Sequence, residues 1–356
     1  MTAITDRSLQ RPLSVPSADE LETRSVLKKC VAAQAALADL RVAAWSFVNP
    51  ALTTTIFSLL EAKDSCQIAN VVTTIDALFR ASNGLKVDDG GAAHQVLRYR
   101  SALLAAVASP EPLSVATASR LAHALAPQTI PPLIPLSSQR DLAERLATWT
   151  KLLNQTDSLE PLVHWAVTHY LFVAAQPFAL ATGPAGRILN LLSLMNSGAL
   201  DLPVLYLSRH LLETKADYDR RLSAVTQTGD WQPFLDYMLT ALEQSAMWST
   251  GKLRATHTLM DMAAAHIRNH APKIYSPELT ELIFAEPYTR VAHLVNAGIA
   301  KRQTAAVYLK QLSAIGILKE QKVGRDKIFV HRKYLYLLTR DENAVTAYPA
   351  PVLANS

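Results

Sequence analysis

The sequence predicts a mainly α-helical protein, and three features of its composition and pattern support that fold class. The 356 residues include only 11 glycines, whereas alanine and leucine are abundant. This balance favours long helices over barrels, sandwiches and glycine-rich phosphate-binding folds. Hydrophobic residues make up 49% of the chain and charged residues 18%, which is enough apolar material for a core and too little charge for a disordered chain. Apolar residues also recur at helical spacing as far as position 270.

The first predicted helix follows an N-terminal arm that contains two prolines. Val26, Cys30 and Ala33 begin a run of apolar residues at alternating steps of four and three, and Asn49-Pro50 stops the run. Later helices repeat this amphipathic pattern and are separated by proline, serine and aspartate. The predicted helices span 20–48, 51–64, 92–108, 115–126, 138–154, 160–175, 186–198, 208–226 and 232–270.

The last third of the chain changes character. The stretches PELTELIFA, YTRVAHLVNAG and KRQTAAVYLKQLSAIG predict three short helices, and ILKEQKVGRDKIFV predicts two short strands around a turn. Three helices followed by a basic hairpin predict a winged helix-turn-helix. Its candidate DNA-binding residues are Lys301, Arg302, Gln303 and Thr304 at the start of the third helix, with Arg325 and Lys327 on the wing.

The basic charge of the chain lies in this same region. Residues 272–340 contain 12 Lys and Arg against 5 Asp and Glu, a net charge of +7, so the rest of the chain carries −2 of the total of +5. A basic helix and hairpin favour duplex DNA as a partner. Winged helices also serve as protein-docking modules, so a protein partner stays open.

No apolar run is long enough for a transmembrane helix or a signal peptide, so we expect a cytoplasmic protein with no membrane partner. Two cysteines, Cys30 and Cys66, are expected to be buried thiols. His266 and His270 have one-turn spacing but no third ligand nearby in sequence, and we predict no metal site.

Several blocks of the sequence resemble the Fic-domain family. The run HYLFVAAQPFALATGPAGRILNLLSLMNSGALDLPVLYLSRHLLETKADYDRRL is similar to the core of these nucleotidyltransferases, which typically move AMP from ATP onto a hydroxyl of a target protein. EAKDSCQIANVVTTIDALFRA stands in the place of the family's inhibitory helix, and one Fic subgroup carries a C-terminal winged helix. The resemblance spans roughly residues 20–340 and implies an N-terminal helical region with a degenerate inhibitory helix (19–110), a Fic-like core (111–270) and a winged helix domain (271–340). A mobile N-terminal arm (1–18) and a C-terminal tail (341–356) are expected outside it.

The catalytic motif of the family is altered here. It reads His-Pro-Phe-x-Asp/Glu-Gly-Asn-Gly-Arg-x-x-Arg, and Gln176 stands at the general base, Leu180 at the magnesium ligand and Pro184 at the first arginine. An amide does not take up a proton near neutral pH, and a leucine offers no oxygen to a hard cation. The resemblance leaves Gly183, Arg187 and Tyr218 as nucleotide-binding candidates. His169 lies seven residues before Gln176, about 10 Å along a helix, and is too far away to replace the base.

Two regulatory parts of the family pattern are altered as well. In the inhibitory motif Ser/Thr-x-x-x-Glu-Gly/Asn, this chain has Ser65, Ala69 and Asn70, so alanine replaces the glutamate that pairs with the last arginine of the catalytic motif. Arg187 is therefore expected to have lost its partner. Where the family has a β-hairpin flap that holds the target, this chain has only PQTIPPLIPLS, which is poor in N–H donors.

We therefore expect a catalytically degenerate Fic-family protein, a pseudoenzyme that binds or regulates a partner. Candidate partners are another Fic protein or its target, duplex DNA, and a second copy of the chain in a homodimer. The alternative is a nucleotidyltransferase with residual or redirected activity, in which Gln176, Thr182 and Arg187 would be the polar groups of a rebuilt pocket. No cofactor is expected, and ATP and magnesium would enter only under that alternative.

Overall fold

The computed structural model describes residues 15–349 except 48, 83, 85, 127–135, 156–157, 179–180 and 324–325. Leu180 and Arg325 therefore lie outside the described residues, as do positions 127–135 of the segment expected to replace the flap. The chain divides into two compact units, one formed by residues 1–41 and 57–247 and the other by 42–56 and 248–356. The first is called the helical unit here, and the second the winged-helix unit.

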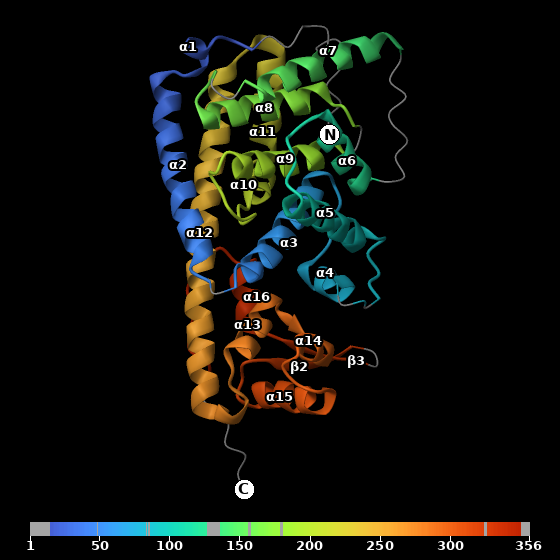
Figure 1. Cartoon of the computed structure of the whole chain (residues 1–356), viewed down its shortest axis with the longest axis vertical. Coiled ribbons are helices and arrows are strands. Elements are labelled where there is room, and N and C mark those ends of the chain that lie inside the picture. Colours follow the sequence, from blue (N-terminus) through green and yellow to red (C-terminus); the bar gives the residue numbers. More distant parts are fainter. Residues whose placement is uncertain are drawn as a thin grey trace. The chain divides into compact units, whose positions relative to one another are not determined.

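The helical unit is built from helices alone in its described part (Figure 1). Its elements are α1 (Ala18–Leu21), α2 (Arg24–Trp45), α3 (Pro50–Ile68), α4 (Ile75–Ser82), α5 (Ala92–Ala108), α6 (Val115–Leu125), α7 (Leu136–Leu153), α8 (Pro161–Ala175), α9 (Thr182–Asn196), α10 (Leu207–Glu213), α11 (Lys215–Thr228) and α12 (Trp231–His270). Helices α2, α3 and α12 each contribute residues to both units. The mainly α fold class predicted from the sequence is confirmed.

Helix α8 is the centre of the helical unit, with α7, α9 and α11 packed around it (Figure 1). It is buried on nearly every face, as expected for a helix that is apolar all round. Pro161 occupies its first turn, and the Glu160 side chain accepts hydrogen bonds from the N–H groups of Leu162 and Val163. This cap satisfies two of the N–H groups that a helix start leaves without partners.

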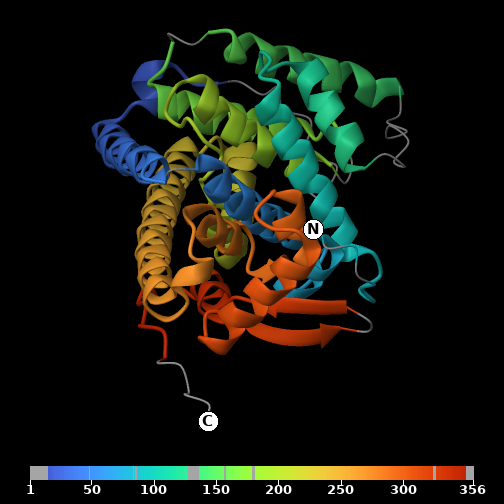
Figure 2. The same ribbon diagram turned by 60° about the horizontal axis from the view of Figure 1, so that its bottom comes forward.

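The winged-helix unit contains the predicted helices and hairpin and one further strand. Its elements after α12 are the short 3₁₀ helix η2 (Pro272–Ile274), α13 (Pro277–Ala285), β1 (Tyr288–Thr289), α14 (Val291–Asn296), α15 (Arg302–Ala314), β2 (Lys319–Val323), β3 (Asp326–Val330) and α16 (Arg332–Thr339). The sheet has the order β1-β3-β2 and is antiparallel throughout, with Tyr288 and Lys319 both opposite Val330. Figure 2 shows the hairpin β2–β3 as a pair of antiparallel arrows.

Several details differ from the sequence-based expectation, and helices α4 and α16 were not predicted at all. The helix predicted over 208–226 is two helices, because the backbone of Thr214 has φ −111° and ψ 27° and leaves the helical conformation. The stretch YTRVAHLVNAG begins as strand β1, a two-residue strand that is too short to show an alternating pattern. The helix predicted over 186–198 already begins at Thr182, which places Gly183 and Pro184 in its first turn.

The chain that follows α16 lies along the winged-helix unit and is held by buried polar groups. The Lys252 side chain is 0% exposed, and its Nζ donates to the carbonyls of Arg340 at 2.5 Å, Glu342 at 2.9 Å and Asp341 at 3.2 Å. Farther along, the buried Tyr348 hydroxyl lies 3.0 Å from Nε2 of His331. An ammonium group at the C-terminal end of a helix also complements the helix dipole.

Candidate functional site

The catalytic-motif segment forms a tight turn between α8 and α9. Gln176 follows the last residue of α8 in the left-handed conformation, with φ 46° and ψ 53°, and its side chain is exposed. The Thr182 hydroxyl closes the turn, because it accepts from the N–H of Phe178 at 2.9 Å and donates to the carbonyl of Phe178 at 2.7 Å. Thr182 is the first residue of α9 and has a structural role in this turn, where its hydroxyl forms hydrogen bonds with Phe178.

Arg187 lies on the first turns of α9 and is only 5% exposed. Its Nε donates to Oγ of Ser65 at 2.7 Å, and its Nη2 donates to the carbonyl of Ser65 at 2.8 Å. Ser65 belongs to α3, so these two buried bonds tie α9 to α3. We expected Arg187 to have lost its partner with the glutamate at position 69, and the structure shows instead that Ser65 binds it.

Glycine at position 183 allows the guanidinium of Arg187 to lie against the start of α9. A Cβ atom at this position would come within 3.2 Å of Nη1 of Arg187. That distance is short enough to force the arginine side chain to move. Gly183 and Arg187 thus form one packed unit with Ser65.

The segment that resembles the inhibitory motif lies at the end of α3. Ala69 is half-buried, and Asn70 adopts the left-handed conformation with φ 64°. The N–H of Val71 donates to the carbonyl of Cys66 at 2.9 Å, a bond that is typical of a helix C-terminus with a left-handed residue. Of the three motif positions, Ser65 is therefore the one that holds Arg187, and Asn70 terminates the helix.

Two buried carboxyl groups on α3, Glu61 and Asp64, extend this polar cluster, and neither was predicted from the sequence. Glu61, one turn before Ser65, accepts hydrogen bonds from the N–H of Ser208 at 2.9 Å and from its hydroxyl. Asp64 accepts a hydrogen bond from the hydroxyl of Tyr206. Burial raises the pKa of Glu61 to about 7, although the Ser208 hydrogen bonds and the charge of Arg187 act in the opposite direction. Acidic residues at core positions of an amphipathic helix are the sequence signal that could have revealed this cluster.

Tyr218 points into the protein core. Its hydroxyl lies 2.7 Å from Nε2 of His169, and both side chains are buried. Burial lowers the pKa of His169 to about 3, so the imidazole is neutral at pH 7. The pair joins α8 to α11. In the described part of the chain, His169 forms no hydrogen bond with the exposed Gln176 side chain.

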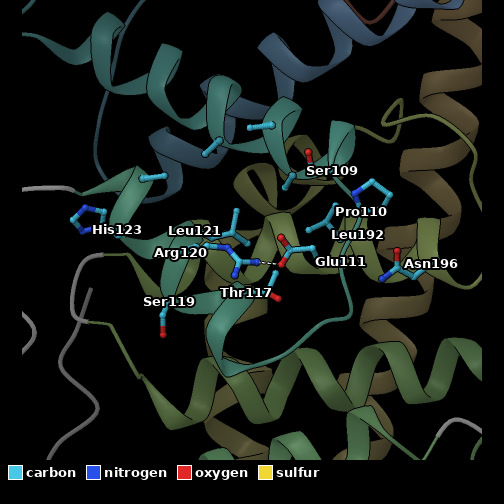
Figure 3. Close-up of a pocket in the computed structure, with 14 residues that line it drawn as sticks. Ser109, Pro110, Glu111, Thr117, Ser119, Arg120, Leu121, His123, Leu192 and Asn196 are labelled. Atoms are coloured by element: carbon cyan, nitrogen blue, oxygen red, sulfur yellow. Dashed lines mark hydrogen bonds and ion pairs between the residues drawn. The ribbon is translucent and has the colours of Figure 1, made fainter.

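A pocket of about 630 Å³ lies between α5, α6 and the C-terminal half of α9 (Figure 3). Its wall is mainly apolar, with Leu121, Leu192 and several alanine methyl groups, and Arg120 and Glu111 form an ion pair across it. Gln176 and Arg187 are not among its lining residues. The pocket is therefore separate from the motif turn.

The predicted DNA-binding residues come together at the start of α15. Lys301 is the N-cap residue of this helix, and Lys301, Arg302, Gln303 and Thr304 are all exposed. On the wing, Lys327 is exposed and forms an ion pair with Glu320 across the hairpin.

The structure also bears on the predicted absence of metal and membrane sites. His266 Nε2 lies 2.8 Å from the carbonyl oxygen of Ile315, and its ring lies tilted against that of His270, with centroids 4.5 Å apart. Within residues 15–349, gaps excepted, no three His, Cys, Asp or Glu side chains are grouped closely enough to bind a metal ion. None of the described helices has the length and hydropathy needed to cross a bilayer.

Comparison with known proteins gives matches at both ends of the chain. Residues 27–108 match the family model described as Fic/DOC family N-terminal, and residues 259–334 match that described as protein adenylyltransferase SoFic-like, C-terminal domain. A crystal structure of a Fic family protein from Desulfovibrio desulfuricans is similar with a TM-score of 0.57 and 17% identity, over 90% of this chain and 98% of that one. Fic-1 from C. elegans is similar with a TM-score of 0.51 and 20% identity, over 64% of this chain and 73% of that one.

Proposed function

Since the two domain matches and the fold make this chain a Fic-domain protein, we propose that it acts as a non-catalytic binding or regulatory protein of that family. The observation that carries the proposal is the burial of Arg187 against Ser65. The one motif arginine left in the chain is thereby engaged inside the protein. A nucleotide would have to displace two charge-assisted hydrogen bonds to reach it.

The residues at the reacting positions support the same proposal. Gln176 is exposed at the position of the general base but carries an amide, which cannot accept the proton of a target hydroxyl. A general base contributes about 10² to 10⁴ in rate, and a bridging metal adds several kcal/mol of transition-state stabilisation. Leu180 supplies no ligand for that metal. Loss of both groups removes most of what such an enzyme adds beyond binding.

Incubation of the full chain with labelled ATP and magnesium or manganese tests the proposal. We expect no labelling of the protein or of lysate proteins, and none from a Gln176→His variant, because Leu180 and Pro184 stay in place. Calorimetry should give weak ATP binding that is the same with and without magnesium. Robust labelling by the wild type would overturn the proposal in favour of residual nucleotidyl transfer.

The exposed start of α15 favours a second candidate function, the binding of duplex DNA. Four consecutive exposed residues, 301–304, stand at the N-terminal end of the third helix, which is the end that contacts base edges in helix-turn-helix proteins. The wing would approach the backbone with Arg325 and Lys327. Because Lys327 forms an ion pair with Glu320, we expect it to contribute less to DNA affinity than Lys301 and Arg302 at the start of α15.

A salt series of anisotropy titrations on the full chain tests this candidate. Each neutralised phosphate adds about 0.9 to the slope of log affinity against log salt, so a Lys301→Ala, Arg302→Ala double variant should flatten the slope by nearly 2. Lys273→Ala removes an exposed lysine from η2 and serves as the control. If the wild type binds no better than the double variant, α15 docks a protein instead.

A further inference from the structure

The exposed face of α15 carries an apolar residue that the core does not use. Leu309 and Leu312 fill the buried face of this helix, both at 0% exposure, and Ala305 joins them. Val307 points the other way and is 50% exposed. The packing of the winged-helix unit therefore does not account for a β-branched apolar side chain at this position.

Val307 shares its face with Gln303 and Lys310. The spacings of four and seven residues place all three on one side of a helix, and all three are exposed. Among the described residues, the Gln303 side chain has no hydrogen-bond partner. An amide with unused donor and acceptor groups, a valine one turn later and a lysine two turns later thus form one continuous strip.

The charged residues near the strip indicate which class of partner it binds. From Pro287 to Lys319 the sequence contains five Lys and Arg residues and no Asp or Glu. All of β1, α14 and α15 fall in this segment. A segment whose charged residues are all basic, beside the uncharged Gln303 and Val307, is complementary to the phosphate backbones that border a DNA groove.

The chemistry of the strip matches an A·T-containing major groove. Glutamine pairs with N6 and N7 of adenine, and apolar side chains contact the C5 methyl group of thymine. One helical turn advances about 5 to 6 Å, which is less than two base-pair steps of 3.4 Å each. Residues one turn apart can therefore meet neighbouring base pairs.

We infer that Gln303 and Val307 are a specificity-determining pair that selects duplex DNA with an adenine and a thymine methyl group in adjacent base pairs. The inference rests on the DNA-binding candidate function proposed above. In it, Gln303 donates to N7 and accepts from N6 of the adenine, Val307 packs on the thymine methyl group, and Lys301, Arg302 and Lys310 contact phosphates.

The test begins with selection of duplexes from a random-sequence pool by the full chain. In the enriched site, each thymine is replaced in turn by deoxyuridine, which removes only the C5 methyl group, and affinity is measured by anisotropy. At one position the wild type should lose about fourfold in affinity, the factor that corresponds to the burial of one methyl group. The Val307→Ala variant should bind the two duplexes equally.

A second exposed valine provides the matched control. Val295 on α14 is 40% exposed, and Val295→Ala should keep the fourfold discrimination. For Gln303, replacing the adenine by 7-deazaadenine removes the N7 acceptor, and it should weaken the wild type by about fivefold or more. The Gln303→Ala variant should not distinguish the two bases.

The possible failures separate the inference from its premise. The specificity-determining pair is overturned if the selected site shows no loss of affinity on deoxyuridine substitution. It is also overturned if the Val307→Ala variant shows the same loss as the wild type. Either result leaves DNA binding itself intact. If no duplex is enriched above the level of the Lys301→Ala, Arg302→Ala variant, the DNA-binding function fails as well. The strip around Val307 would then belong to a protein interface.

Discussion

Ser65 and Glu61 on α3 show how strongly a few buried polar side chains can affect the stability of the fold. Ser65 accepts from Arg187, and Glu61 accepts from Ser208. Buried polar groups are costly when they lose a partner, because the remaining donor or acceptor cannot turn to water. The cluster should therefore respond strongly to substitutions that hardly change side-chain volume.

Ser65→Ala is predicted to destabilise the protein by about 1 to 3 kcal/mol, because it leaves Nε of the buried Arg187 guanidinium without an acceptor. Urea unfolding of the full chain measures the change. Ser245→Ala is the control, since Ser245 is also buried and its hydroxyl has no hydrogen-bond partner among the described residues. Equal losses in the two variants would show that the bond to Arg187 contributes nothing.

Glu61 is predicted to make the protein less stable as pH rises. Its folded-state pKa of about 7 lies above the ordinary value of 4.5, so the folded protein binds more protons than the unfolded chain between these values. Its contribution is complete below pH 4.5 and is lost by about pH 7, a change of roughly 3 kcal/mol. His169 acts in the opposite direction, because burial lowers its pKa to about 3.

The difference between wild type and Glu61→Gln isolates the Glu61 contribution. Between pH 5 and pH 8, the free energy of unfolding of the wild type should fall relative to that of the Glu61→Gln variant. The wild type should therefore have its smallest advantage over the variant, or be less stable than it, at the alkaline end of this range. Glu111→Gln, which removes an exposed carboxylate, should run parallel to the wild type. A difference between wild type and Glu61→Gln that stays constant across this range would contradict the assignment.

At the scale of elements, apolar periodicity in the sequence predicts some parts of the fold and misses others. Long helices with clear apolar periodicity, such as α5 and α12, are predicted to within a residue or two. The break at Thr214, the strand β1 and the helix α16 were missed. No glycine or proline marks the break at Thr214. Strand β1 depends on pairing with β3, and α16 begins after His331, whose side chain accepts from the N–H of Tyr334. The contact between Arg187 and Ser65 was missed for the same reason, since it joins residues 122 positions apart.

Thr182→Val is predicted to loosen the α8–α9 turn and to cost about 1 to 2 kcal/mol, because valine keeps the shape but loses both bonds to Phe178. Hydrogen exchange of the Phe178 amide should accelerate along with the drop in stability. Thr250→Val on α12 is the matched control, since the buried Thr250 hydroxyl has no hydrogen-bond partner among the described residues. The idea fails if Phe178 exchanges at the wild-type rate.

At the scale of the whole molecule, the division into two units predicts that their stabilities are separable. The buried polar cluster around Ser65, Glu61 and Arg187 belongs to the helical unit, and Lys252 belongs to the winged-helix unit. A substitution in the polar cluster or at Lys252 should first reduce the protection of backbone amides from hydrogen exchange in the unit that contains it. The same division lets nucleotide and DNA binding be tested on one protein with variants that leave the other unit unchanged.

Lys252→Met is predicted to destabilise the winged-helix unit by about 2 to 3 kcal/mol, because three carbonyl groups after α16 lose a charged donor. Hydrogen exchange read by mass spectrometry should show faster exchange in peptides from 330–345 than in peptides from α8. Lys273→Met removes an exposed lysine and should change neither. Uniform acceleration across both units would argue against separable stabilities.

The buried bonds of α3 also constrain the order in which the chain can mature during synthesis. Ser65, Asp64 and Glu61 find their partners at Arg187, Tyr206 and Ser208, between 122 and 147 residues later. Until those residues leave the ribosome, α3 cannot bury its polar groups at low cost. A nascent chain that stalls before position 187 should therefore keep α3 accessible to proteases and chaperones.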